Sequence, residues 1–384
     1  MRKRLWMGGI ALTIVAGIAL WVGTVDHLDL LDHSTRITSI RGWGLEQPDA
    51  GIPLEPGELL AERAQYQWVG KRQILFFHGM KPIQVSIPPP SSPGSSPLAI
   101  VQRPASVATP TLYDVATHRE QALPRLAQLF HGNNYNVQQA TVAPDGTRLF
   151  WQSSSCHFDI ALLDGSQHAH FDKEPDVTIG WPQDRAEAYT YGWAKDAHMH
   201  SIKMQNSRVI AVHFWDRNGG KGLGQSLFVA PANMRMLGDF KLLSNGDLAA
   251  NTLETNPPPL TLYRISPTPN SVIHSVVPPL PAGTTVEALI YSPQGDRVAW
   301  IIDRDWVSPF AFLHRWLPRY APKPRRTASI WVSGPMGENL HEIGHILFHP
   351  KRQQFCLIDY VRWQPDEKNL SFVSNDILYT VPAN

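Results

Sequence analysis

Charge is scarce in this chain of 384 residues, and cysteine is almost absent from it. Only 17% of the residues are charged and the formal net charge is +1, which excludes a protein that binds nucleic acid by neutralising many phosphates. The two cysteines, Cys156 and Cys356, fall in repeats that we expect to lie far apart, beyond the reach of a disulfide. We therefore predict two isolated thiols and no nucleic-acid partner.

Proline and aromatic residues, by contrast, are plentiful. The chain has 33 prolines and 13 tryptophans, and 10% of its residues are aromatic. This composition is typical of a β protein with many turns and a substantial core, and it argues against disorder.

One short pattern occurs three times at distant positions, as a turn that leads into an apolar strand. The copies are residues 143–151 (APDGTRLFW), 292–300 (SPQGDRVAW) and 364–372 (QPDEKNLSF). Proline sets φ for the turn, Asp-Gly or Gln-Gly permits the reversal, and the following residues are expected to alternate between buried and exposed. Each copy therefore predicts a β-hairpin.

Weaker copies near residues 69, 182 and 244 bring the mean spacing to about 59 residues, enough for four short strands with their loops. A second apolar strand pattern follows most of the turns, as at 159–163 and 329–333. Repeats of this kind bury their faces only against their neighbours. The sequence predicts an all-β fold, a six-bladed β-propeller of four-stranded antiparallel blades.

The repeated motif, a Pro-Asp-Gly turn followed by a basic and then an aromatic residue, resembles the TolB-type propeller repeat over residues 60–384. The resemblance implies the propeller fold and a tendency to bind partners, but no reaction. Related propeller hydrolases carry a separate domain with a G-x-S-x-G motif. The nearest string here, 224–228 (GQSLF), lacks the second glycine. No serine hydrolase activity is implied.

The N-terminal region contains a long uncharged segment at residues 5–25, preceded by three basic residues at 2–4. Twenty-one residues of helix rise about 31 Å, which matches the apolar thickness of a bilayer. Basic residues favour the cytoplasmic side, so we expect a single transmembrane helix with the rest of the chain in the periplasm or outside the cell. A cleaved signal peptide is the alternative, although the apolar run is long for one.

The predicted domains are this anchor at 1–25, a linker at 26–60 and the propeller at 61–384. The linker contains an alternating stretch at 36–40 that could supply a closing strand to the last blade. A proline- and serine-rich segment at 88–97 interrupts the first repeat, and we expect a solvated loop there rather than a docking segment.

An insertion at 303–328 in the fifth repeat mixes aromatic and basic residues. Its aromatic and leucine residues from 312 to 320 share one face of a helix, which could bind a partner or a lipid surface, or fold back onto the propeller itself. Tryptophan and arginine dominate binding hot spots. The predicted contact residues are Trp306, Arg315, Trp316 and Arg319.

The string His341-Glu342-Ile343-Gly344-His345 matches the H-E-x-x-H signature of zinc proteases, in which the motif lies on a helix. The repeat pattern instead places it on a strand, where the two histidines would lie about 13 Å apart, too far to share one zinc. A zinc-dependent hydrolase that uses His341, Glu342 and His345 therefore remains only the alternative.

The sequence thus predicts a membrane-anchored propeller that binds an envelope protein or peptide and is not an enzyme, with no cofactor and no metal. A third possibility, a sensor that signals across the membrane, is disfavoured because only four residues precede the apolar segment. The identity of the ligand and the oligomeric state are not predicted.

Overall fold

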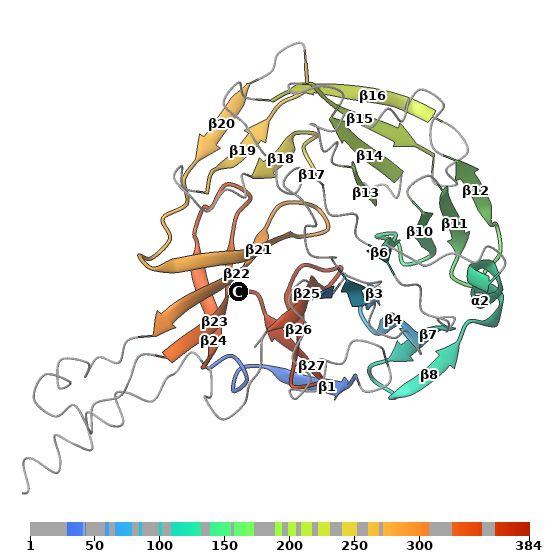
Figure 1. Ribbon diagram of the computed structural model, residues 1–384, viewed down its shortest axis with the longest axis horizontal. Helices are drawn as coiled ribbons and strands as arrows, with labels where there is room; N and C mark the ends of the chain where they lie inside the picture. Colours follow the sequence, from blue (N-terminus) through green and yellow to red (C-terminus); the bar gives the residue numbers. More distant parts are fainter. Residues whose placement is uncertain are drawn as a thin grey trace, which may run out of the picture.

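Short antiparallel strands form most of the regular structure in the computed structural model (Figure 1). The residues that the structure describes are 29–40, 43, 58–60, 66–78, 84–86, 100–101, 109–131, 139–154, 157–172, 189–193, 199–204, 209–216, 222–230, 240–251, 260–268, 272–306, 325–347 and 358–384. Within these ranges no helix is long and apolar enough to cross a bilayer. The predicted anchor at 5–25 lies outside them.

Five four-stranded blades each take their strands from one stretch of the chain. They are β3 (Gln67–Val69), β4 (Gln73–His78), β7 (Thr109–Asp114) and β8 (Arg119–Ala122); β9 (Gln139–Val142), β10 (Arg148–Ser154), β11 (His157–Leu162) and β12 (Ala169–Asp172); β13 (Tyr189–Trp193), β14 (Met199–Met204), β15 (Val209–Trp215) and β16 (Gly222–Val229); β17 (Phe240–Leu242), β18 (Leu248–Asn251), β19 (Leu262–Ile265) and β20 (Ile273–Val276); and β21 (Thr284–Tyr291), β22 (Val298–Trp306), β23 (Arg325–Ser333) and β24 (His341–Leu347). All their strand pairs are antiparallel, which confirms the predicted propeller of four-stranded antiparallel blades.

The remaining four-stranded sheet, which we call the closing sheet, combines both ends of the described chain. Its strands are β25 (Asp359–Trp363), β26 (Asn369–Ser374) and β27 (Ile377–Pro382), with β1 (Thr35–Ser39) as the fourth. Thr35 pairs with Thr380 and Ser39 with Ile377. The prediction of six repeats that each make a blade is therefore corrected to five. The last repeat supplies three strands, and β1, from the predicted linker, completes its sheet.

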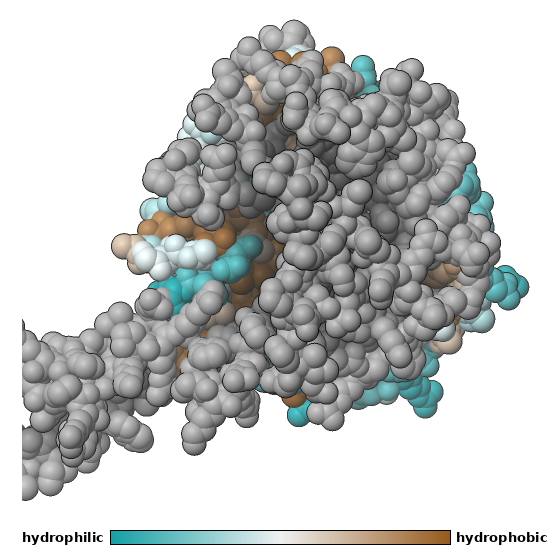
Figure 2. Space-filling model, in the orientation of Figure 1, coloured by the Kyte–Doolittle hydropathy of each residue, from teal (hydrophilic) through white to brown (hydrophobic). Residues whose placement is uncertain are grey.

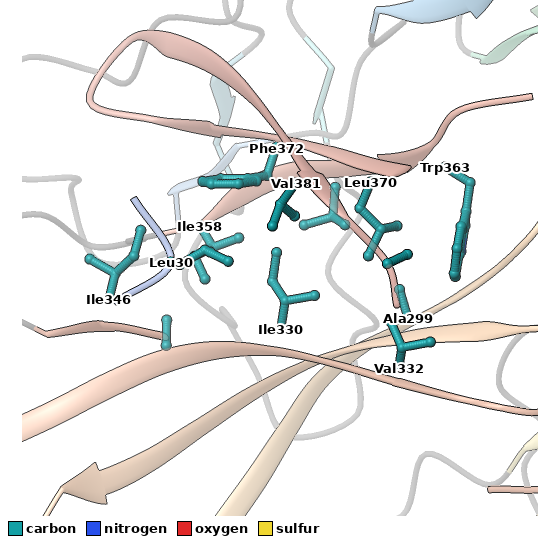
Figure 3. Close-up of a cluster of buried hydrophobic side chains, with 13 residues drawn as sticks. Leu30, Ala299, Ile330, Val332, Ile346, Ile358, Trp363, Leu370, Phe372 and Val381 are labelled. Carbon is teal, nitrogen blue, oxygen red and sulfur yellow. The ribbon is translucent and has the colours of Figure 1, made fainter. Parts of the chain in front are cut away.

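The sheets stand around a common centre, with β3, β13 and β17 toward the middle and β8, β12, β16 and β20 at the periphery (Figure 1). A buried apolar cluster occupies each junction between neighbouring sheets. Figure 3 shows the cluster between the β21–β24 blade and the closing sheet, where Ile330 and Val332 face Leu370 and Phe372. Every sheet therefore buries both of its faces against its neighbours, as a closed ring requires.

This double burial corrects the predicted alternation of buried and exposed residues. Leu149 and Trp151 lie in the cluster toward the first blade, whereas Phe150 lies in the cluster toward the third. All three are at most 2% exposed. Successive side chains point to opposite faces of a strand, so a strand enclosed by two neighbours is apolar at every position.

Two further elements lie outside the four-stranded sheets. Helix α2 (Pro124–His131) follows the first blade and inserts Leu126 and Phe130 into the cluster shared with the second. A small antiparallel sheet joins β2 (Glu58–Leu60), β5 (Gln84–Ser86) and β6 (Ile100–Val101). It links the predicted linker to the segment that contains the proline-rich residues 88–97, a pairing that the sequence did not predict.

Candidate functional site

The turns that the sequence repeats are interlocked between neighbouring sheets. Lys71 in the β3–β4 turn forms an ion pair of 3.7 Å with Asp366 in the β25–β26 turn. Ser244 in the β17–β18 turn donates a hydrogen bond of 2.7 Å to Asp296 in the β21–β22 turn. Arg297 of that turn donates a hydrogen bond to the backbone oxygen of Glu367. We call this side of the propeller the turn end.

A matched pair of glycines tests how tightly the turn end is packed. Gly295 and Gly246 occupy equivalent turns with φ of +78° and +85°, but a Cβ on Gly295 would lie 3.1 Å from Leu243 Cα, whereas nothing lies within 4 Å at Gly246. Both alanine substitutions share the strain of a positive φ. We expect Gly295→Ala to lower the unfolding free energy by about 1 kcal/mol more than Gly246→Ala in urea titrations. Equal losses would contradict the contact between these turns.

The opposite side of the propeller carries the long connections. Antiparallel strands reverse direction, so the connections between second and third strands lie at the end away from the turns. Residues 79–108 join β4 to β7 there, and residues 307–324 join β22 to β23. We call this side the insertion end. The proline-rich segment and the basic aromatic insertion therefore start from the same side of the ring.

Of the four predicted contact residues, the structure describes only Trp306. Trp306 is the last residue of β22 and pairs with Arg325, the first residue of β23. Arg315, Trp316 and Arg319 lie outside the described residues, so their role stays a prediction. Figure 2 shows apolar and polar surface side by side at the left of the molecule, in the place of β21 and β22 in Figure 1.

The H-E-x-x-H string lies on strand β24 and not on a helix. His341 pairs with Val332, Glu342 with Trp331 and His345 with Ser329. His341 is exposed, and its Nδ1 lies 2.8 Å from the backbone oxygen of Asn339, whereas His345 is buried. Within the described ranges no group of three or more His, Cys, Asp and Glu side chains is arranged to hold a metal ion. The zinc alternative thus lacks a ligand set there.

A β-bulge at Ile343 lets the polar residues of this strand contact one another and a residue of β22. Ile330 pairs with Gly344 and Trp331 with Glu342, so Ile343 is the extra residue. The bulge brings Glu342 and His345 to the same face, where Glu342 Oε1 lies 2.6 Å from His345 Nδ1. Arg304 from β22 donates a hydrogen bond of 2.7 Å to the other carboxylate oxygen. Glu342 therefore joins strands β22 and β24 across β23.

The incoming chain covers the outer edge of the same strand. Leu30 donates a backbone hydrogen bond of 2.9 Å to His345, and Asp29 forms a parallel bridge with that residue. The Leu30 side chain is fully buried in the cluster of Figure 3. Asp29 and Leu30 thus lie at the rim of the blade that carries the 307–324 connection.

Two basic groups near the β14 and β17 strands are strongly desolvated. Burial, together with the positive charge of Lys241, lowers the pKa of His200 to about 3. Burial also lowers the pKa of Lys241, an effect that Glu367 partly offsets. His200 Nδ1 is buried and has no hydrogen-bond partner among the described residues. The imidazole is consequently neutral near neutral pH and adds no charge beside Lys241.

Comparison with known proteins gives similarity in fold only. No protein-family model matches the sequence, and no curated protein matches it. Among solved structures, a chain of a mitotic checkpoint complex is 13% identical, with a TM-score of 0.39 and coverage of 91% of this chain and 99% of that one. A candidate TolB protein of Agrobacterium tumefaciens is 11% identical, with a TM-score of 0.38 and coverage of 85% and 90%. The β-propeller domain of Cps50 (Swd1) from Myceliophteria thermophila is 8% identical, with a TM-score of 0.42 and coverage of 86% and 100%. The propeller assignment rests on the strand pairing and on the junction clusters.

Proposed function

We propose that this chain is a membrane-anchored propeller outside the cytoplasm that binds an envelope protein or peptide at its insertion end and catalyses no reaction. The observation that carries the proposal is the difference between the two ends of the ring. The turn end is held together by contacts between neighbouring turns, such as Lys71 with Asp366 and Ser244 with Asp296. The insertion end carries the long connections, one of which, residues 307–324, contains four aromatic residues and two arginines.

The proposed contact residues are Trp306, Arg315, Trp316 and Arg319. Aromatic and arginine side chains contribute most of the binding energy in protein interfaces because they bury large areas and make several hydrogen bonds. A connection that starts from a blade fixed by the Arg304–Glu342 ion pair is attached to a rigid base. A rigid base lowers the entropy lost when a partner binds.

The proposed membrane anchor is the apolar run at 5–25. It is followed closely by Asp29 and Leu30, which contact β24, and then by β1, which completes the closing sheet. An anchor placed there would be joined to the ring through a paired strand instead of a free linker. Protease added to intact spheroplasts should then digest the propeller domain, and protection of that domain would contradict the orientation.

Site-specific cross-linking tests the binding surface. A photoreactive residue at position 316 in the full chain should cross-link to an envelope protein in intact cells, and the adduct should disappear in an Arg315→Ala/Arg319→Ala background. The matched control is position 245, an exposed residue of the turn end. Adducts of equal yield at both positions, or no adduct at 316, would contradict the proposal.

A further inference from the structure

The outer strand β20 exposes an uncharged apolar edge. Residues 272–277 read VIHSVV. Val272, Ile273, Val276 and Val277 are 40–54% exposed, and they account for most of the large hydrophobic side chains exposed in the described residues. In the described part of the chain β20 is the last strand of its sheet, with β19 as its neighbour. None of the described strands pairs with its other edge.

The other outer strands in the described ranges have features that hinder pairing. β8 carries Arg119 and Glu120, β1 carries Arg36, and β12 ends at Asp172. Leu30 covers β24. β16 has a bulge at Leu223 and accepts a hydrogen bond at Leu227 from Thr268. Natural sheets protect their edges with charges, bulges and covering segments of this kind, and an exposed apolar edge without them is a template for pairing with another strand.

The register of the hairpin decides which backbone groups of β20 are available. Ser266 donates a backbone hydrogen bond to Val272, and the pairs continue without a bulge to Leu262 with Val276. Hydrogen-bonded and non-bonded pairs alternate in an antiparallel ladder. Residues 272, 274 and 276 therefore bond to β19, whereas Ile273, Ser275 and Val277 direct their N–H and C=O groups outward.

We propose that β20 pairs with β20 of a second copy of this chain. In an antiparallel pair of this strand with itself, residues whose backbone groups point away from β19 must lie opposite each other. The register centred on Ser275 meets this condition along the whole strand. It places Ile273 opposite Val277 of the second copy at both ends and Ser275 opposite its own equivalent. Apolar side chains thus meet apolar side chains.

The absence of charged residues from the strand also favours a second copy of the chain as its partner. No Asp, Glu, Lys or Arg lies within 272–277, so the pairing brings no like charges together, and His274 faces Val276. A strand with its own charge would match a complementary strand better than itself. A single strand pair is a small interface, so we expect a weak dimer.

Cysteine cross-linking tests this register in the full chain, in a Cys156→Ser/Cys356→Ser background. The Cα atoms of a hydrogen-bonded antiparallel pair lie about 5.5 Å apart, within disulfide range. Ser275→Cys should therefore give a disulfide-linked homodimer under mild oxidation. His274→Cys, its neighbour, should give at least about tenfold less because it lies off the two-fold axis. Equal yields would overturn the register, and adducts only with other proteins would overturn the second copy as occupant.

A pair of charge variants tests the same contact without a cysteine. Ile273→Lys/Val277→Lys places lysine opposite lysine and should reduce co-purification of two differently tagged copies by about tenfold. Ile273→Glu/Val277→Lys places opposite charges there and should retain it. The two variants replace the same exposed residues, so similar melting temperatures will show that both fold. Equal loss in both variants, or a wild-type chain that never co-purifies, would overturn the proposal.

Discussion

A chain that starts at residue 41 is expected to lose cooperative unfolding, whereas one that starts at residue 29 is expected to keep it. The two truncations differ only in the segment that contains β1. That segment supplies Leu30 and Ile40, which are both fully buried, to the clusters on either side of the closing sheet. It also supplies the strand that pairs with β27.

The expected loss is large compared with the stability of a domain. Burial of a leucine or isoleucine side chain contributes about 1.5–3 kcal/mol, and the removal of β1 would also leave the backbone of β27 unpaired. The net stability of a typical domain is only about 5–15 kcal/mol. Urea titrations followed by near-ultraviolet circular dichroism should show a transition for the longer chain and no cooperative transition for the shorter one. Equal midpoints would contradict closure by β1.

The second large effect is expected at Glu342. The substitution Glu342→Ala leaves the Arg304 guanidinium and the His345 imidazole without their shared carboxylate. Breaking a buried ion pair costs about 3–5 kcal/mol because the remaining charge stays desolvated. The Arg304 side chain is 24% exposed, so water recovers part of this cost. We expect a loss of about 2–3 kcal/mol in unfolding free energy.

The control for this substitution lies one residue away on the same strand. His341 is exposed and its imidazole makes a hydrogen bond with a backbone oxygen, so His341→Ala should change the stability by less than about 0.5 kcal/mol. A zinc site would behave differently, because His341 and His345 would both be ligands and the substitution of either would release the metal. Stoichiometric zinc in the purified protein that is lost in His341→Ala and His345→Ala would contradict the structural role of Glu342.

The sequence predicted the parts of the fold that local chemistry determines. The Pro-Asp-Gly and Pro-Gln-Gly turns at 144–146 and 293–295 occur as predicted, because proline and glycine limit the backbone there whatever surrounds them. The burial of Phe150 was not predictable, since it depends on a neighbouring blade. The exposure of the β20 edge was not predictable either, because its apolar residues resemble those of a buried strand.

The candidate site also includes features that the sequence predicted and features that it did not. The motif at 341–345 was correctly expected on a strand, because the repeat pattern places the fourth strand of the fifth repeat there. Its contacts depend on the bulge at Ile343 and on Arg304 from another strand, and neither leaves a mark in the local sequence. The basic aromatic connection was identified from its composition and the spacing of its apolar residues, and its contact residues remain a prediction.

Native-state hydrogen exchange tests the central claim most directly, because it compares β1 with the rest of the ring in one experiment. If β1 is an integral strand of the closing sheet, the paired amides within Thr35–Ser39 should exchange through the same opening reaction as those of β26, with the same free energy. Exchange of the β1 amides near the rate of an unstructured peptide, while β26 stays protected, would contradict a ring closed by both ends of the chain.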